Sequence, residues 1–123
     1  KLHAQYNEKF TSAEAEADAL AASLNKRKRE IEQLTTSYSA RVSAYNQDVA
    51  AFNQQATTGG FQTQAEFQAE RTWLSQRGLA LRHEQQAIQG KVDAYNTDVE
   101  KLNALGRKIN QLNQSLDSQK AVK

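Results

Sequence analysis

A seven-residue repeat of apolar residues runs through both halves of this chain of 123 residues. We call the repeating position a of a heptad abcdefg. In the first half it is occupied by Phe10, Ala17, Leu24, Ile31, Tyr38, Tyr45 and Phe52. In the second half it is occupied by Phe67, Leu74, Leu81, Ile88, Tyr95, Leu102, Ile109 and Leu116. Such a repeat keeps one apolar stripe on one side of a helix, so it predicts two long helices that pack along their stripes.

The d positions of the same heptads change character along the chain. Toward the two ends most of them are apolar, whereas in the middle they are charged. In the middle the second apolar residue of a turn moves to position e, at Val42, Val49, Val92 and Val99. The steps from Leu34 to Tyr38 and on to Val42 make a stutter, which locally unwinds a left-handed supercoil. We therefore expect a nearly straight stretch rather than a uniform coiled coil.

The segment between the two stripes carries helix stop and start signals. Gly59 and Gly60 follow the first stripe, and Gly is favoured after a helix because it adopts positive φ without a Cβ clash. Thr63 and Glu66 then have the spacing of a capping box, in which the Thr63 hydroxyl accepts from the Glu66 amide and the Glu66 carboxylate reaches back.

These signals predict an all-α fold with helices over about 4–56 and 64–119. Because a short loop joins two long helices, we expect an antiparallel coiled-coil hairpin. We predict a single domain over 1–123, with arm one at 1–56, a tip loop at 57–63 and arm two at 64–123. The sequence does not begin with Met, so we expect a mature form or an excerpt of a larger protein.

The two stripes can be aligned by pairing Phe52 with Phe67 across the turn. Tyr45 then meets Leu74, and Asp48 lies opposite Arg71, near the tip. An offset of half a heptad, three or four residues, is common in antiparallel coils and is the alternative register.

Composition excludes several classes of site. The chain has no Cys, so disulfides and thiolate metal sites are excluded. Its mean hydropathy is −0.82 and it has no apolar run of about 18 residues, so we expect no transmembrane segment. His83 and Glu84 lack the second His of an H-E-x-x-H motif, and His3 is far away in the sequence. We therefore expect no metal, no cofactor and no catalysis.

The charge of the chain is nearly balanced, with 16 Lys and Arg against 14 Asp and Glu. The one dense basic run, Lys26–Arg29, would point around the whole circumference of a helix. Since it forms no single basic face, we expect it to be solvated and expect no nucleic-acid partner.

Two surfaces are candidate interaction sites. Near the tip lie Phe61, Phe67, Trp73 and Arg71, and aromatic residues beside an exposed loop are common interface anchors. The alternative is that these rings plug the end of the hairpin. The second candidate is the flank formed by Val42, Val49, Val92 and Val99, which widens the apolar stripe and suits a homodimer that forms a four-helix bundle.

One run, Val92–Asn103, has the pattern V-x-x-Y-N-x-x-V-x-x-L-N, which recurs over Val42–Asn53 with Phe52 in place of Leu. The pattern resembles coiled-coil segments of predicted bacterial exported proteins, some of which precede a matrixin-like zinc metalloprotease domain. The protease signature is absent, so the resemblance implies a helical accessory region without catalytic residues. It also implies an extracytoplasmic bacterial setting.

The leading functional prediction is a non-catalytic structural module, a coiled-coil stalk or spacer that presents an aromatic tip to a protein partner. One alternative is a homodimerisation module that forms a four-helix bundle. The other alternative is the accessory coiled-coil region of an exported bacterial metalloprotease.

Overall fold

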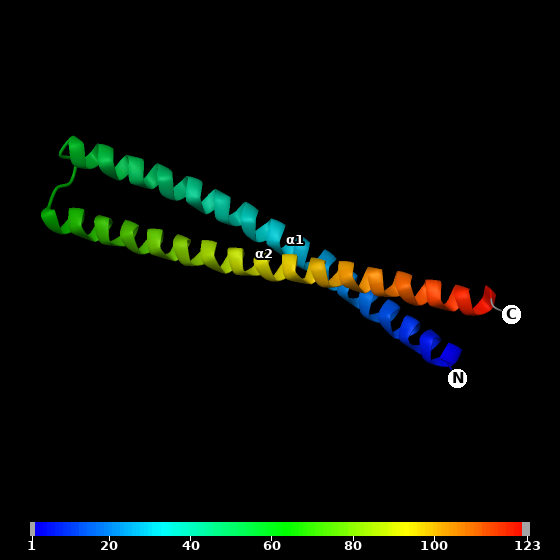
Figure 1. The fold of residues 1–123 in the computed structure, drawn as a ribbon. Helices are drawn as coiled ribbons and strands as arrows, with labels where there is room; N and C mark the ends of the chain where they lie inside the picture. Colours follow the sequence, from blue (N-terminus) through cyan, green and yellow to red (C-terminus); the bar gives the residue numbers. More distant parts are fainter. Residues whose placement is uncertain (1, 122–123) are drawn as a thin grey trace. The chain divides into compact units, whose positions relative to one another are not determined.

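Two long helices joined by a short loop make up the fold (Figure 1). The computed structural model of the protein describes residues 2–121, and the side chains of residues 4–117. Helix α1 covers Leu2–Thr57 and helix α2 covers Gln64–Ala121, and the described residues include no strand. The predicted all-α antiparallel hairpin is confirmed, and each helix begins and ends within two residues of its predicted bounds.

The end of α1 is fixed by a Schellman motif. The Gly60 amide donates to the Gln55 carbonyl at 2.8 Å, and the Gly59 amide donates to the Ala56 carbonyl at 3.4 Å. Gly59 has a φ of 69°, a conformation that a residue with a Cβ adopts only at a cost. The predicted role of Gly59 as the helix-ending residue is therefore confirmed.

The start of α2 is fixed by Thr63 and Glu66. The Glu66 amide donates to the Thr63 hydroxyl at 3.1 Å, which confirms the first half of the predicted capping box. The Glu66 carboxylate reaches back as predicted, but it accepts from the amide of Gln62 at 3.1 Å, one residue before the cap. Two of the amides that precede the regular hydrogen bonding of α2 are thus satisfied by side chains.

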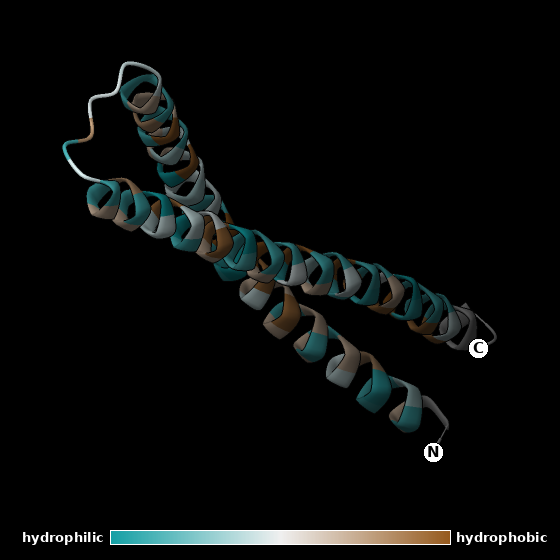
Figure 2. Ribbon diagram, turned by 90° about the vertical axis from the view of Figure 1, so that its left-hand side faces the viewer, coloured by the Kyte–Doolittle hydropathy of each residue, from teal (hydrophilic) through white to brown (hydrophobic). Residues whose placement is uncertain are grey.

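The helices divide into two compact units, each of which pairs a stretch of α1 with a stretch of α2. The loop unit comprises Ile31–Lys91, and the end unit comprises Lys1–Glu30 with Val92–Lys123. Along each helix, hydrophobic bands alternate with hydrophilic ones (Figure 2), as the heptad repeat requires.

The predicted stutter is visible in the burial pattern of the loop unit. Leu34, Tyr38, Val42 and Tyr45 are half-buried, whereas Arg41 at the intervening d position is exposed. The apolar line therefore passes from position d to position e where the sequence predicts it. We call the line of half-buried residues along which the helices face each other the seam.

The register of the loop unit differs from the predicted alignment. Asp48 Oδ2 lies 2.6 Å from Arg77 Nη1, so its predicted pairing with Arg71 is wrong. A second ion pair joins Arg41 to Glu84. The hydroxyl of Tyr45 lies over Gly78, where a Cβ would be only 2.7 Å away.

The predicted contact between Phe52 and Phe67 is confirmed, with ring centroids 5.3 Å apart. Away from the loop, residues of α1 face residues four to six positions further along α2 than predicted, so the half-heptad offset is the nearer of the two predicted registers. The cause is that an apolar stripe repeats every seven residues and accepts either alignment. The space over Gly78 and the charge pairs select one of them.

The end unit holds most of the buried apolar side chains among the described residues. Ala13, Leu24, Leu112 and Leu116 are each 8% exposed or less, whereas Leu74 alone reaches that level among the described residues of the loop unit. Arg27 Nη1 lies 2.5 Å from Asp98 Oδ2, so the d-position Arg of the basic run is paired across the seam. The other three basic residues of that run are exposed, which agrees with the prediction that the run is solvated.

Candidate functional site

Three phenylalanine rings pack together at the loop end of the hairpin. Phe61, in the loop, lies 5.4 Å from Phe52 and 5.4 Å from Phe67 between ring centroids, and all three residues are half-buried. These separations are typical of favourable tilted and edge-to-face pairs. Phe61 and Phe67, both predicted to bind a partner, are therefore engaged with each other, as the plug alternative requires.

Trp73 differs from the phenylalanines because its side chain remains accessible. The residue is 49% exposed, one of the two large apolar residues that are most exposed among the described residues. Its ring lies under the guanidinium of Arg77, one turn further along α2, with 4.5 Å between the Arg77 Cζ and the ring centroid. This geometry is a cation–π contact, which fixes the indole on the surface.

Arg77 is itself held on two further sides. It pairs with Asp48 across the seam, and its Cζ lies 5.5 Å from the ring centroid of Tyr45. Its side chain is only 25% exposed, so much of the stem is covered. A guanidinium that contacts a carboxylate and two rings has few alternative positions. Its contact with the indole of Trp73 also restricts the positions that the indole can adopt.

A groove with an apolar floor lies in the loop unit, and Arg77, which covers the Trp73 ring, is one of its lining residues. It has a volume of about 320 Å³ and is lined by Ala44, Ala80 and Leu81 with Arg41, Arg77 and Glu84. The two alanines occupy g positions, where their short side chains leave the space open. We call Trp73, Arg77, Ala44, Ala80 and Leu81 the Trp73 surface.

The heptad pattern alone does not predict this groove. Its signal was present, because g positions of both helices in this region carry small residues, at Ser37, Ala44, Ala51, Ala80 and Ala87. These small residues indicate a groove only once the register is known, because the register places Ala44 beside Ala80.

Arg71 does not belong to the Trp73 surface. It is exposed and forms no ion pair with any residue whose side chain is described. It occupies position e of its heptad and Trp73 occupies position g, which lie on opposite sides of the seam. The predicted tip cluster therefore separates into a phenylalanine plug, an exposed Trp73 surface and an isolated arginine.

The valine flank lies along the seam of each unit. Val42 and Val49 in the loop unit and Val92 and Val99 in the end unit are all half-buried, like the other seam residues. Their predicted role in a dimer stays a prediction, since packing within the hairpin already accounts for their partial burial.

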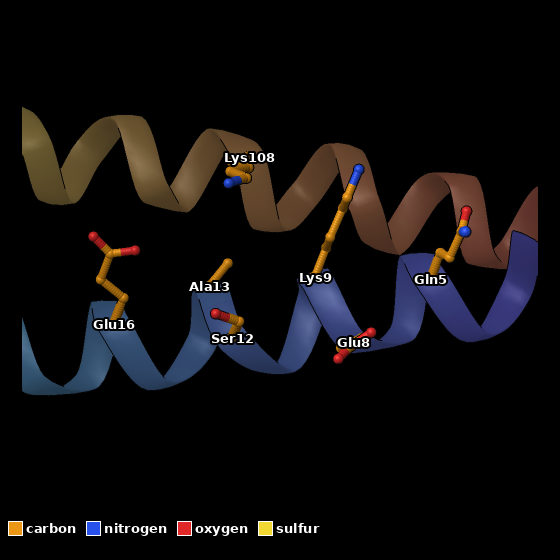
Figure 3. A pocket seen from close by; sticks show the side chains of 7 residues that line it. All are labelled: Gln5, Glu8, Lys9, Ser12, Ala13, Glu16 and Lys108. Carbon is orange, nitrogen blue, oxygen red and sulfur yellow. The ribbon is translucent and has the colours of Figure 1, made fainter.

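A polar groove of about 470 Å³ lies in the end unit (Figure 3). Lys9 and Glu16 of α1 extend toward α2 on either side of Ala13, and Glu8 and Lys108 complete the charged lining. The mixture of two lysines and two glutamates gives the groove no net preference for anions or cations.

Two further kinds of site, a metal site and a membrane-spanning helix, are not found among the described residues. Residues 4–117 contain no group of three or more His, Cys, Asp or Glu side chains placed to hold a metal ion. Over the part of the chain that the structure describes, neither helix has an apolar stretch of the length that crosses a bilayer.

Comparison of the chain with models of protein families, with curated proteins and with solved structures gives no match. The resemblance to coiled-coil segments of exported bacterial proteins therefore stays a prediction, as does the accessory role that it implies.

Proposed function

We propose that this chain is a non-catalytic interaction module, a helical hairpin that acts as a stalk or spacer and presents the Trp73 surface to a protein partner. The observation that carries the proposal is the half-exposed indole of Trp73, held in place by Arg77. Trp and Arg are the residue types that most often dominate the energy of protein interfaces. An indole that is already fixed before binding loses little conformational freedom when a partner covers it.

The phenylalanine plug supports this proposal indirectly. Phe52, Phe61 and Phe67 close the loop end of the hairpin, and Phe67 lies six residues before Trp73 on α2. Because the plug holds the start of α2 against α1, it keeps Arg77 within reach of Asp48 and so maintains the Trp73 surface.

Photo-crosslinking in the cell that produces the protein tests the proposal. A benzophenone amino acid replaces Gln76, which is exposed on the same side of α2 as Trp73, or Ser75, which is exposed on the other side. We expect a discrete crosslinked product from position 76 and none from position 75. The Trp73→Ala variant should abolish the product, because it removes the anchor of the interface.

Leu79→Ala is the matched control for Trp73→Ala. Leu79 is 53% exposed and occupies position f, outside the Trp73 surface, so its truncation should leave the crosslinked product unchanged. Absence of a product from position 76, or a product that survives Trp73→Ala, would overturn the proposed function.

A further inference from the structure

We infer that the partner of the Trp73 surface is a second copy of this chain, placed antiparallel to the first so that Trp73 of each copy packs on Ala87 of the other. This inference rests on the proposed function and names the partner for the same surface. It assigns the dimer contact to g positions of the loop unit rather than to the valine flank.

The charges around the groove favour a partner without net charge. Arg41 is paired with Glu84 and Arg77 is paired with Asp48, so each basic residue at the groove is already matched by a carboxylate of the same chain. A nucleic acid or a strongly acidic peptide would find no unpaired cation here. A copy of the same face, apolar in its middle and neutral at its ends, brings no unpaired charge to the interface.

The spacing of residues on α2 makes the face complementary to itself. Trp73, Ala80 and Ala87 occupy successive g positions, with Ala80 midway between the other two. A two-fold axis beside Ala80 therefore brings the two Ala80 residues together at the centre of the interface. The same axis places each exposed indole over the small Ala87 side chain of the other copy. Ala44 and Ala80 leave the space that close helix packing needs at the centre.

The exposed area supports a second copy as well. The chain exposes 9111 Å², whereas a compact domain of 13.8 kDa exposes about 6,600 Å². A stable dimer removes roughly 800 Å² or more from each partner. The loop unit also has Leu74 as its one buried apolar residue among those described, so it gains more from a further layer of helices than the end unit does.

Light scattering and oxidative crosslinking of the purified full chain test the inference. We expect a mass of twice 13.8 kDa at 100 µM or thereabouts, and a dissociation constant raised at least ~10-fold by Trp73→Ala or Ala80→Arg. Ala50→Arg is the matched control, because Ala50 is exposed at position f of α1, outside the proposed interface. Circular dichroism of each variant identifies any loss of helix.

A cysteine variant keeps the test decisive if Ala80→Arg disturbs folding. The natural chain has no Cys, so Ala80→Cys introduces the sole thiol. We expect Ala80→Cys to form a disulfide-linked dimer on mild oxidation and Ala50→Cys to remain monomeric, since a disulfide requires Cα atoms within about 7 Å.

The outcomes separate this inference from the proposed function. A monomeric mass together with a crosslinked product of another size at position 76 would overturn the second copy as partner and leave the proposed function standing. A dimer that is insensitive to Trp73→Ala and gives no Ala80→Cys disulfide would also overturn the inference. Absence of any crosslinked product at position 76 would overturn both the inference and the proposed function.

Discussion

At the scale of single residues, Gly78 decides how the loop unit is aligned. The Tyr45 ring occupies the space that a side chain at position 78 would need, with the hydroxyl 2.7 Å and Cζ 3.3 Å from the place of a Cβ. The large side chain of Tyr45 on α1 thus packs where Gly78 on α2 has no side chain. The sequence contains both residues, but nothing local in either helix shows that they meet.

Replacing Gly78 should therefore not give the gain in stability that is expected from replacing a glycine in open space. Gly90→Ala should raise the free energy of unfolding by about 0.5–1 kcal/mol, because nothing lies within 4 Å of its Cβ and Ala favours the helix. Gly78→Ala should be neutral or destabilising, because the Tyr45 ring must move. Urea unfolding followed by circular dichroism measures both values.

Tyr45→Phe provides the control for this comparison. It removes the hydroxyl that makes the shortest contact, so Gly78→Ala should cost less in the Tyr45→Phe background than in the natural chain. Equal effects of Gly78→Ala and Gly90→Ala would show that the Tyr45 ring does not constrain position 78.

At the scale of the helices, the charged residues at d positions help to specify the register between α1 and α2. Arg27 with Asp98 in the end unit, and Arg41 with Glu84 and Asp48 with Arg77 in the loop unit, each join a d position of α1 to a d position of α2. These pairs are partly exposed, so each contributes modestly to stability. Their main effect is to disfavour shifted alignments, which would leave the same charges unpaired or place like charges together.

A double-mutant cycle distinguishes the observed register from the predicted one. Asp48→Asn and Arg77→Met should show a coupling of about 0.3–1 kcal/mol, the range for a partly exposed ion pair. Asp48→Asn and Arg71→Met should show no coupling within error, because Arg71 lies on the other side of the seam from this pair. The free energy of unfolding in urea is measured for each variant at low salt, where the pair is screened least.

The reverse pattern, with coupling to Arg71 and none to Arg77, would restore the alignment in which Asp48 faces Arg71. Reduction of the Asp48–Arg77 coupling at 1 M salt should accompany the expected result, since screening weakens exposed charge pairs.

At the scale of the whole molecule, stability depends on few buried residues. The described residues include five buried apolar side chains, four of them in the end unit, and the remainder of the seam is half-buried. Deleting one of the five should therefore remove a large part of a free energy of unfolding that is about 5–15 kcal/mol in typical domains.

Leu24→Ala should destabilise the protein by about 2–4 kcal/mol, because Leu24 is 5% exposed and its truncation leaves a cavity. Leu79→Ala should change the free energy of unfolding by less than about 0.5 kcal/mol, because Leu79 is 53% exposed. Both values come from urea unfolding at one protein concentration, since a dimer would make stability depend on concentration. Similar losses for the two variants would contradict the assignment of Leu24 to the core.

Local signals in the sequence specify the two helices, their bounds and the turn. Heptad spacing sets the apolar stripes, Gly59 provides the positive φ, and Thr63 with Glu66 caps α2, and each of these signals acts between residues close together in the chain. The stutter at Tyr38 was readable for the same reason, because it is a feature of spacing within one helix.

The register and the candidate site depend instead on contacts across the seam. The stripe has the same appearance after a shift of one heptad, so the choice depends on contacts between residues distant in sequence, such as Tyr45 with Gly78 and Asp48 with Arg77. That choice leaves Trp73 exposed and opens the groove between Ala44 and Ala80. Local spacing specifies each helix, whereas the fit between side chains across the seam specifies which surface remains for a partner.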